Sequence, residues 1–155
     1  MVVGHSPVVF CRYIATAHYV AEHLKAAFPK ATVDAVTGEL TPEERRERVE
    51  DMEDAGQRIL VATDCLSEGI NLQHLFTAVV HYDLAWNPTR HEQREGRVDR
   101  FGQQADEVRC TMLYGQDNPV DGFVLNVILR KGETIQKELG VLVPLPEDEA
   151  RINQA

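Results

Sequence analysis

The chain has 155 residues, which is the size of one globular domain. Hydrophobic residues make up 43% of it and charged residues 26%, a balance typical of folded proteins and not of disordered ones. Sixteen Lys and Arg against 25 Asp and Glu give a net charge of −9, which argues against nucleic-acid binding over the whole surface but leaves room for a local basic site. The sequence has no apolar run of about 18 residues and no signal-like start, so we expect no membrane partner.

The cysteines and histidines show no pattern of a disulfide or metal protein. Cys11, Cys65 and Cys110 lie far apart in apolar sequence, and no Cys-x-x-Cys occurs. This distribution predicts small buried thiols in a reducing cytoplasm. The histidines lack ligand spacings such as His-Glu-x-x-His, so we expect no metal site.

Along the first half of the chain, short apolar runs rich in β-branched residues alternate with helix-like segments. Residues 8–11 and 31–36 are expected to form strands, with a helix over residues 15–28 between them. The sequence Thr41-Pro42-Glu43-Glu44 has the pattern of a capping box with proline at the first helical position. It predicts a helix that continues to about residue 54.

The second half continues this alternation. We expect strands at residues 58–62, 78–82 and 107–114, and helices at about residues 89–100 and 120–139, the last ended by Gly140. Strands that alternate with helices imply parallel pairing, so the expected fold is α/β, a three-layer αβα sandwich with a mostly parallel sheet. We assign residues 1–140 to this domain and residues 141–155, which are acidic and contain proline, to a tail.

In such sheets, functional groups gather beyond the carboxyl ends of the strands. That rule points to Arg12, to Thr37 and Gly38, and to residues 63–71 and 83–88. Polar side chains occur in each of these stretches, which favours a binding site along one edge of the sheet.

The segment from Thr89 to Arg100 carries four arginines, at positions 90, 94, 97 and 100. Its charged pairs three or four residues apart are 90/94, 92/95, 94/97, 95/99 and 97/100, and all five are like-charged. Each such pair destabilises an isolated helix by about 0.2–0.5 kcal/mol, so the pattern does not stabilise the helix. On a helix, Gln93 and the arginines would share one side and the carboxylates the other.

A guanidinium group stays charged and presents a planar fork that matches carboxylate or phosphate oxygens. The arginine segment therefore favours an anion or phosphate site, and Gly96 would let another backbone or a ligand come close. The alternative is that these arginines pair with acidic residues elsewhere in an acidic protein.

Taken together and in order, these segments resemble the C-terminal RecA-like domain of a superfamily two helicase or translocase. The sequence of residues 8–24 resembles the motif IV strand and helix, and ATDCLSEGINLQ (62–73) resembles motif V. HYDLAWNP (81–88) and QREGRVDRFGQ (93–103) resemble the Asp-x-x-Trp-Asn-Pro segment and motif VI. Over about residues 7–130 the chain is most similar to the Swi/Snf-type branch, particularly its bacterial RapA-like members. The resemblance implies a RecA-like fold, the second domain of a P-loop NTPase-type motor.

The resemblance also implies roles at the nucleotide. Arg97 and Arg100 match the arginine fingers that stabilise charge on the γ-phosphate of ATP bound to the other RecA-like domain. Gln93 matches the motif VI glutamine on the γ-phosphate side of the cleft. The motif V turn would line the nucleotide cleft with Glu68, Gly69 and Asn71.

A second set of residues would contact the nucleic-acid backbone by the same resemblance: Arg12, Thr37, Gly38 and Thr63. Two have simpler alternatives, because Thr63 could satisfy a backbone group at its strand end and Arg12 could be an ordinary surface residue. Asp83 and Trp86 are interpreted as structural residues that brace the motif VI helix.

The half of the motor that grips ATP is absent from this sequence. No Gly-Lys dipeptide occurs, so a Gly-x-x-x-x-Gly-Lys P-loop cannot be drawn, and no strand ends in Asp-Glu. We therefore expect ATP and Mg²⁺ to be bound mainly by a missing N-terminal RecA-like domain of the same polypeptide. The isolated domain is expected to be inactive.

The sequence thus predicts the C-terminal half of an ATP-dependent nucleic-acid helicase or translocase. The Swi/Snf-like segments favour translocation on double-stranded DNA, in the cytoplasm and associated with the nucleoid if the source is bacterial. The alternative is a non-catalytic phosphate- or nucleic-acid-binding module on the same fold.

Overall fold

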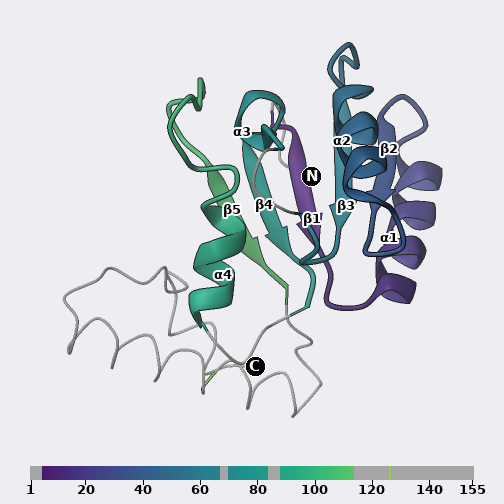
Figure 1. The fold of residues 1–155 in the computed structure, drawn as a ribbon, viewed down its shortest axis with the longest axis horizontal. Helices are drawn as coiled ribbons and strands as arrows, with labels where there is room; N and C mark the ends of the chain where they lie inside the picture. Colours follow the sequence, from purple (N-terminus) through teal and green to yellow (C-terminus); the bar gives the residue numbers. More distant parts are fainter. Residues whose placement is uncertain (1–4, 67–69, 84–87, 114–125, 127–155) are drawn as a thin grey trace.

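A computed structural model of the chain describes residues 5–66, 70–83 and 88–113 together with Asn126 (Figure 1). They form a sheet of five strands in the order β2-β3-β1-β4-β5. The strands are β1 (Pro7–Phe10), β2 (Thr32–Val36), β3 (Arg58–Ala62), β4 (Ala78–His81) and β5 (Arg109–Met112). The helices are α1 (Ile14–Ala27), α2 (Pro42–Glu50), α3 (Leu72–Leu75) and α4 (Pro88–Glu95).

All the strand pairings are parallel, which confirms the expected α/β fold. The central strand β1 is buried along its whole length, and β3 is buried at every position after Arg58. Such unbroken apolar runs are typical of parallel strands that helices cover on both faces. The expected bounds of these strands are right to within one residue.

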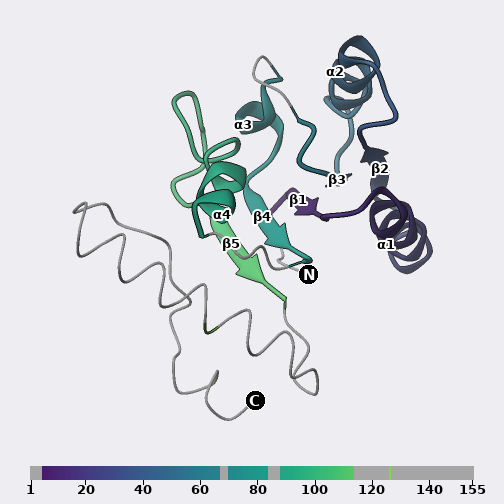
Figure 2. The same ribbon diagram turned by 60° about the horizontal axis from the view of Figure 1, so that its bottom comes forward.

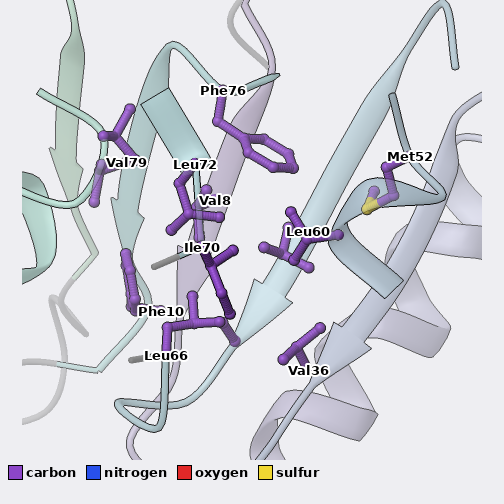
Figure 3. Packing of buried hydrophobic residues seen from close by; sticks show 13 residues of the cluster. Val8, Phe10, Val36, Met52, Leu60, Leu66, Ile70, Leu72, Phe76 and Val79 are labelled. Atoms are coloured by element: carbon purple, nitrogen blue, oxygen red, sulfur yellow. The ribbon is translucent and has the colours of Figure 1, made fainter. Parts of the chain in front are cut away.

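Two groups of buried side chains hold the three layers together. On one face of the sheet, Leu60 packs with Met52, which follows α2, and with Leu72 of α3 (Figure 3). On the other face, Val61 packs with Val20 of α1. Neighbouring residues of β3 thus point into opposite layers, as the two-residue period of a strand requires. Figure 2 shows α1 below the sheet and α2, α3 and α4 above it.

The start of α2 is set by its own sequence. The Thr41 hydroxyl accepts from the Glu44 backbone N–H at 3.2 Å, and the Glu44 carboxylate accepts from the Thr41 N–H at 2.7 Å. This capping box satisfies two donors that the first turn would otherwise leave free, with Pro42 at the first position, and it confirms the expectation. The helix ends at Glu50, and turns cover the residues to Asp54 that were expected to be helical.

Helix α4 is shorter than expected, because it ends at Glu95 and not at Arg100. Gly96 is the first residue beyond it, and glycine is unfavourable in a helix by about 1 kcal/mol relative to alanine. The chain then tightens, with the backbone N–H of Arg97 donating to Arg94 at 3.3 Å and that of Val98 to Glu95 at 3.0 Å. Arg97 therefore lies in a turn and Arg100 in a bend, not on the helix face where the sequence placed them.

Several expectations fall outside the described residues, namely most of the helix at 120–139 and the tail at 141–155. The helices of the described part are all too short or too polar to span a bilayer. Helix α3 was not expected, since its four residues show no helical periodicity. The cysteines are free thiols, but only Cys11 is buried. The expectation of burial is wrong for the exposed Cys110, because β5 is an edge strand in the described sheet.

Candidate functional site

The carboxyl ends of the strands lie along one edge of the sheet (Figure 1). Phe10 stands opposite both Ala62 and His81, and Val36 stands opposite Ala62. The residues that the sequence placed beyond these ends, from Arg12 to Asp83, are therefore neighbours in space.

The neighbouring strands β1 and β4 lead the chain to opposite sides of the sheet, because the chain goes from β1 to β2 at one edge and from β4 to β5 at the other. The helix after β1 lies on one face, whereas α3, after β3, and α4, after β4, lie on the other (Figure 2). In open α/β sheets ligands bind at the carboxyl edge where such a switch occurs. The candidate site is thus at the ends of β1, β3 and β4.

An ion pair between a buried arginine and a half-buried carboxylate lies at this switch point. The Arg94 guanidinium donates from Nε to Asp64 Oδ1 at 2.7 Å and from Nη2 to Asp64 Oδ2 at 2.9 Å. Arg94 is only 2% exposed, so the Asp64 carboxylate replaces the water that would otherwise solvate its positive charge. The pair joins α4 to the residue that follows Thr63 at the end of β3.

The same guanidinium reaches the two neighbouring strands. Its Nη1 donates to the backbone carbonyl of Asp83 at 3.2 Å. Its central carbon, Cζ, lies 5.6 Å from the centre of the Phe10 ring, which is a cation–π distance. The Asp83 carboxylate in turn accepts from the backbone N–H of Arg12 at 2.9 Å. One arginine of α4 therefore contacts residues at the ends of β1, β3 and β4, and Asp83 braces this helix, as the sequence indicated.

Arg90 contacts the same carboxylate from the solvent side. Its Nη1 donates to Asp64 Oδ2 at 3.2 Å, while its side chain stays 55% exposed. Burial raises the pKa of Asp64, but the hydrogen bonds and charges of Arg94 and Arg90 outweigh it and leave the pKa below the usual value. Asp64 is therefore a stable anion that holds two of the four arginines.

A second polar pair lies under α4. His81 Nε2, at the end of β4, is 2.8 Å from Glu95 Oε1, and both residues are buried. The His81 ring lies 4.7 Å from the ring of His91, one turn before Glu95. Burial, followed by the charges of His81 and Arg94, lowers the pKa of His91 to about 3 against a partial opposing effect of Asp64. His91 is consequently a neutral residue at physiological pH.

The segment after α4, residues 96–103, is named the arginine turn here. Val98 is fully buried, whereas Arg97 is half-buried, Arg100 is exposed and Phe101 is 100% exposed. Gln103 closes the segment, because its amide donates to the carbonyls of Phe76 and Val98 at 2.9 Å each. The turn is thus pinned at both ends while its arginines stay accessible.

The residues predicted to lie at the nucleotide are mostly accessible where the structure describes them. Gln93 and Asn71 are exposed, Arg97 and Arg100 lie on the arginine turn, and Glu68 and Gly69 fall outside the described residues. The described members of this set are therefore open, at least in part, to a ligand or to another domain.

The residues predicted to contact nucleic acid divide into two kinds. Arg12 and Gly38 are exposed, whereas Thr37 is 2% and Thr63 is 6% exposed. The Thr63 hydroxyl donates to Cys65 Sγ at 3.2 Å, and its backbone N–H donates to Val36 at 3.2 Å. The Thr37 hydroxyl accepts from the Glu39 N–H at 3.4 Å. Both hydroxyls therefore make local contacts in this structure, that of Thr63 with a thiol and that of Thr37 with a backbone N–H.

Burial in the arginine segment does not follow the sign of the charge. Arg94 and Glu95 are both buried, although the sequence places arginines and carboxylates on opposite sides of a helix. The alternative of internal pairing thus holds for Arg90 and Arg94, and the anion-site interpretation remains for Arg97 and Arg100. A pattern of like charges shows that partners lie elsewhere, but it does not name Asp64 as the partner.

Residues 2–102 match the family described as the helicase conserved C-terminal domain. The chain belongs to this family. Among curated proteins, this helicase C-terminal domain is 38% identical over 85 residues to the "Uncharacterized ATP-dependent helicase YqhH" of Bacillus subtilis, an alignment that covers 55% of the chain and 15% of the relative. It is 34% identical over 97 residues to the "ATP-dependent RNA helicase eIF4A" of Scheffersomyces stipitis, covering 63% and 24%. The chain thus spans less than a quarter of the curated relatives named here.

Two solved structures show a similar fold. The C-terminal part of the Fun30 ATPase domain matches with a TM-score of 0.69 at 20% identity, covering 79% of this chain and 38% of that one. The C-terminal domain of the DEAD-box protein Dbp5 matches with a TM-score of 0.61 at 23% identity, covering 99% and 81%. These likenesses confirm the RecA-like helicase C-terminal fold, and the RapA-like branch stays a prediction.

Proposed function

We propose that this helicase C-terminal domain is half of an ATP-dependent nucleic-acid motor and supplies its arginine fingers. Arg97 and Arg100 are the fingers, and Gln93 lies on the γ-phosphate side of the cleft. ATP and Mg²⁺ are held mainly by an N-terminal RecA-like domain of the same polypeptide. The proposal explains why the sequence has arginine side chains for a phosphate but no P-loop to bind one.

The observation that carries this proposal is the contrast among the four arginines. Arg90 and Arg94 are held by Asp64, whereas the arginine turn leaves Arg97 half-buried and Arg100 exposed. A finger must reach a phosphate bound outside its own domain, so it needs a rigid base and an open end. Pinning by Val98 and Gln103 supplies the base. Electrostatic stabilisation of phosphoryl transfer by such a group contributes about 10³–10⁵ in rate.

We further propose that the motor translocates on double-stranded DNA. The exposed Arg12 and Gly38 are the two predicted track residues that a phosphate backbone could reach directly. Thr37 and Thr63, with buried side chains, would shape the track and offer backbone groups to it. The Swi/Snf-like segments favour DNA, although some relatives are named RNA helicases. A bacterial source would place the motor in the cytoplasm at the nucleoid.

The test joins this domain to the ATPase domain encoded before it in the same gene and measures ATP hydrolysis with double-stranded DNA, single-stranded DNA or RNA. We expect stimulation by double-stranded DNA and a loss of about 10³-fold or more in kcat for Arg97→Ala or Arg100→Ala. Arg46→Ala is the matched control, because Arg46 is exposed on α2, away from the arginine turn. Full activity in both finger variants would contradict the assignment.

The alternative function, a non-catalytic binding module, predicts a different outcome in the same experiment. The joined protein would then bind nucleic acid but hydrolyse no ATP. A gene that encodes no P-loop domain before this one would also favour the binding module. The isolated domain is expected to hydrolyse no ATP, so activity from the pure domain alone would contradict the half-motor.

A further inference from the structure

We infer that Asp64 and Arg94 are positioning residues that hold the arginine turn in register with the nucleic-acid track. The inference rests on the proposed function and concerns two residues to which that function assigns no contact with the nucleotide or with the nucleic-acid track. Both lie at the switch point of the sheet, where the two proposed functions of the domain meet.

On the side of the track, the pair is joined to two predicted contact residues. Asp64 directly follows Thr63 in the chain, and the Asp83 carbonyl that binds Arg94 belongs to the residue whose carboxylate accepts from the Arg12 N–H at 2.9 Å. A nucleic-acid phosphate bound at Arg12 or at Thr63 would therefore contact a residue that is directly joined to a partner of Arg94. Arg12 is joined to Asp83 by a hydrogen bond, and Thr63 is joined to Asp64 by the chain.

On the side of the nucleotide, Arg94 is built into the base of the arginine turn. The backbone N–H of Arg97 donates to the Arg94 carbonyl at 3.3 Å, so the two residues share one turn of chain. The guanidinium makes four contacts, to two Asp64 oxygens, the Asp83 carbonyl and the Phe10 ring, and these contacts restrain the backbone that carries it. A shift of about 1 Å at a catalytic group costs about 10²-fold in rate, so this support is expected to matter for hydrolysis.

The geometry separates this role from general stabilisation of α4. Helix α4 has a second internal anchor, the contact of 2.8 Å between Glu95 and His81, and the arginine turn has a third in the buried Val98. These anchors join the helix to β4 and to the core. The contacts of Arg94 instead reach the segments just beyond β3 and β4, where the track residues lie.

Arg90 provides an internal comparison, because it binds the same carboxylate from solvent at 3.2 Å without touching Asp83 or Phe10 in the contacts described above. If a charge near Asp64 were sufficient, Arg90 and Arg94 would be equivalent. If the important feature is the bridge that the buried Arg94 guanidinium makes between the strand ends, only Arg94 and Asp64 matter.

The experiment uses the complete protein that contains this chain and its ATPase domain. Steady-state hydrolysis is measured against ATP concentration with and without double-stranded DNA for Asp64→Asn, Arg94→Met and Arg90→Met, and melting temperature and DNA affinity are measured beside it. For Asp64→Asn and Arg94→Met we expect the DNA-stimulated kcat to fall about tenfold or more, while KM for ATP and DNA affinity stay within about twofold. Arg90→Met is expected to keep the stimulated kcat within about twofold, as for a surface ion pair.

The outcomes separate the two proposals. A wild-type protein without DNA-stimulated hydrolysis would overturn the proposed function itself. A stimulated wild type whose Asp64→Asn variant is stimulated equally, or whose Arg90→Met variant is as impaired as Arg94→Met, would overturn the positioning pair alone. Should Arg94→Met melt below the assay temperature, Asp64→Asn decides, since asparagine has the same shape and keeps one acceptor. The double variant should be no worse than the poorer single variant, and additive losses would contradict a shared role.

Discussion

The side-chain amide of Gln103 donates to the backbone carbonyl of Phe76 at 2.9 Å and so ties the end of the arginine turn to the end of α3. The same nitrogen donates to the Val98 carbonyl at 2.9 Å, and Gln103 Oε1 accepts from the Ala105 N–H at 3.0 Å. One side chain thus joins three backbone segments. The segment that carries Arg100 is closed by this residue.

We predict that Gln103→Ala lowers the free energy of unfolding by about 1–3 kcal/mol, because two partly buried carbonyls lose their donor. Urea denaturation of the chain measures this change. Gln104→Ala is the matched control, since the neighbouring Gln104 is exposed, and it should change stability by less than about 0.5 kcal/mol. Equal stability of the two variants would show that the amide contacts are dispensable.

Gly102, the residue before Gln103, has a backbone conformation that requires glycine. Its φ is +95°, and a Cβ there would stand 3.3 Å from Cε1 of the His74 side chain on α3. We expect Gly102→Ala to destabilise the domain by about 1–3 kcal/mol through backbone strain. Gly56→Ala is the control, since a Cβ there meets nothing within 4 Å. Thermal denaturation should show a clear loss for the first variant and little change for the second.

The features that could be predicted from sequence are those that depend on residues close together in the chain. The apolar run of β3 gave its bounds correctly, and the capping box at Thr41 gave the start of α2. The end of α4 differs from the expectation, because the helix stops before Gly96 although the periodic arginines continue to Arg100.

The buried residues of the candidate site could not be predicted in the same way. Arg94 is part of the same run of arginines as Arg97, yet one is buried and the other half-exposed. What separates them is the distant Asp64, 30 residues earlier in the chain. A periodic pattern in the local sequence cannot indicate a contact between residues that far apart in the chain. The role of Gln103 was missed for the same reason, since its partner Phe76 lies on another element.

The acid stability of the domain is expected to depend on Asp64. Its pKa is below the ordinary value of 3.8 in the folded protein, because the two arginines outweigh the effect of burial. The pair therefore adds stability above about pH 3.8, and this stability is lost as the pH falls through the lower folded pKa. Asp64→Asn should flatten the loss of stability on the acid side of that value, as measured by urea unfolding at a series of pH values. If the stability of Asp64→Asn fell with pH below 3.8 as steeply as that of the wild type, the ion pair would not be the cause of the loss.

His91 should produce a separate pH dependence nearer neutrality. Its pKa is about 3 in the folded domain against 6.5 ordinarily, with burial as the largest cause, then the charges of His81 and Arg94. Between these two values the unfolded chain binds a proton at His91 that the folded chain does not, so stability falls as the pH falls. The slope from this one group approaches about 1.4 kcal/mol per pH unit.

We predict that His91→Gln reduces this slope between about pH 6 and 4, while it costs some stability at neutral pH through lost packing against the His81 ring. Unfolding free energies across that range, compared with those of the wild type, measure both effects. Because Asp64→Asn acts below about pH 3.8 and His91→Gln above it, the two variants divide the acid unfolding curve between two neighbouring residues of one site. A slope in His91→Gln equal to that of the wild type would mean that another group takes up the proton on unfolding.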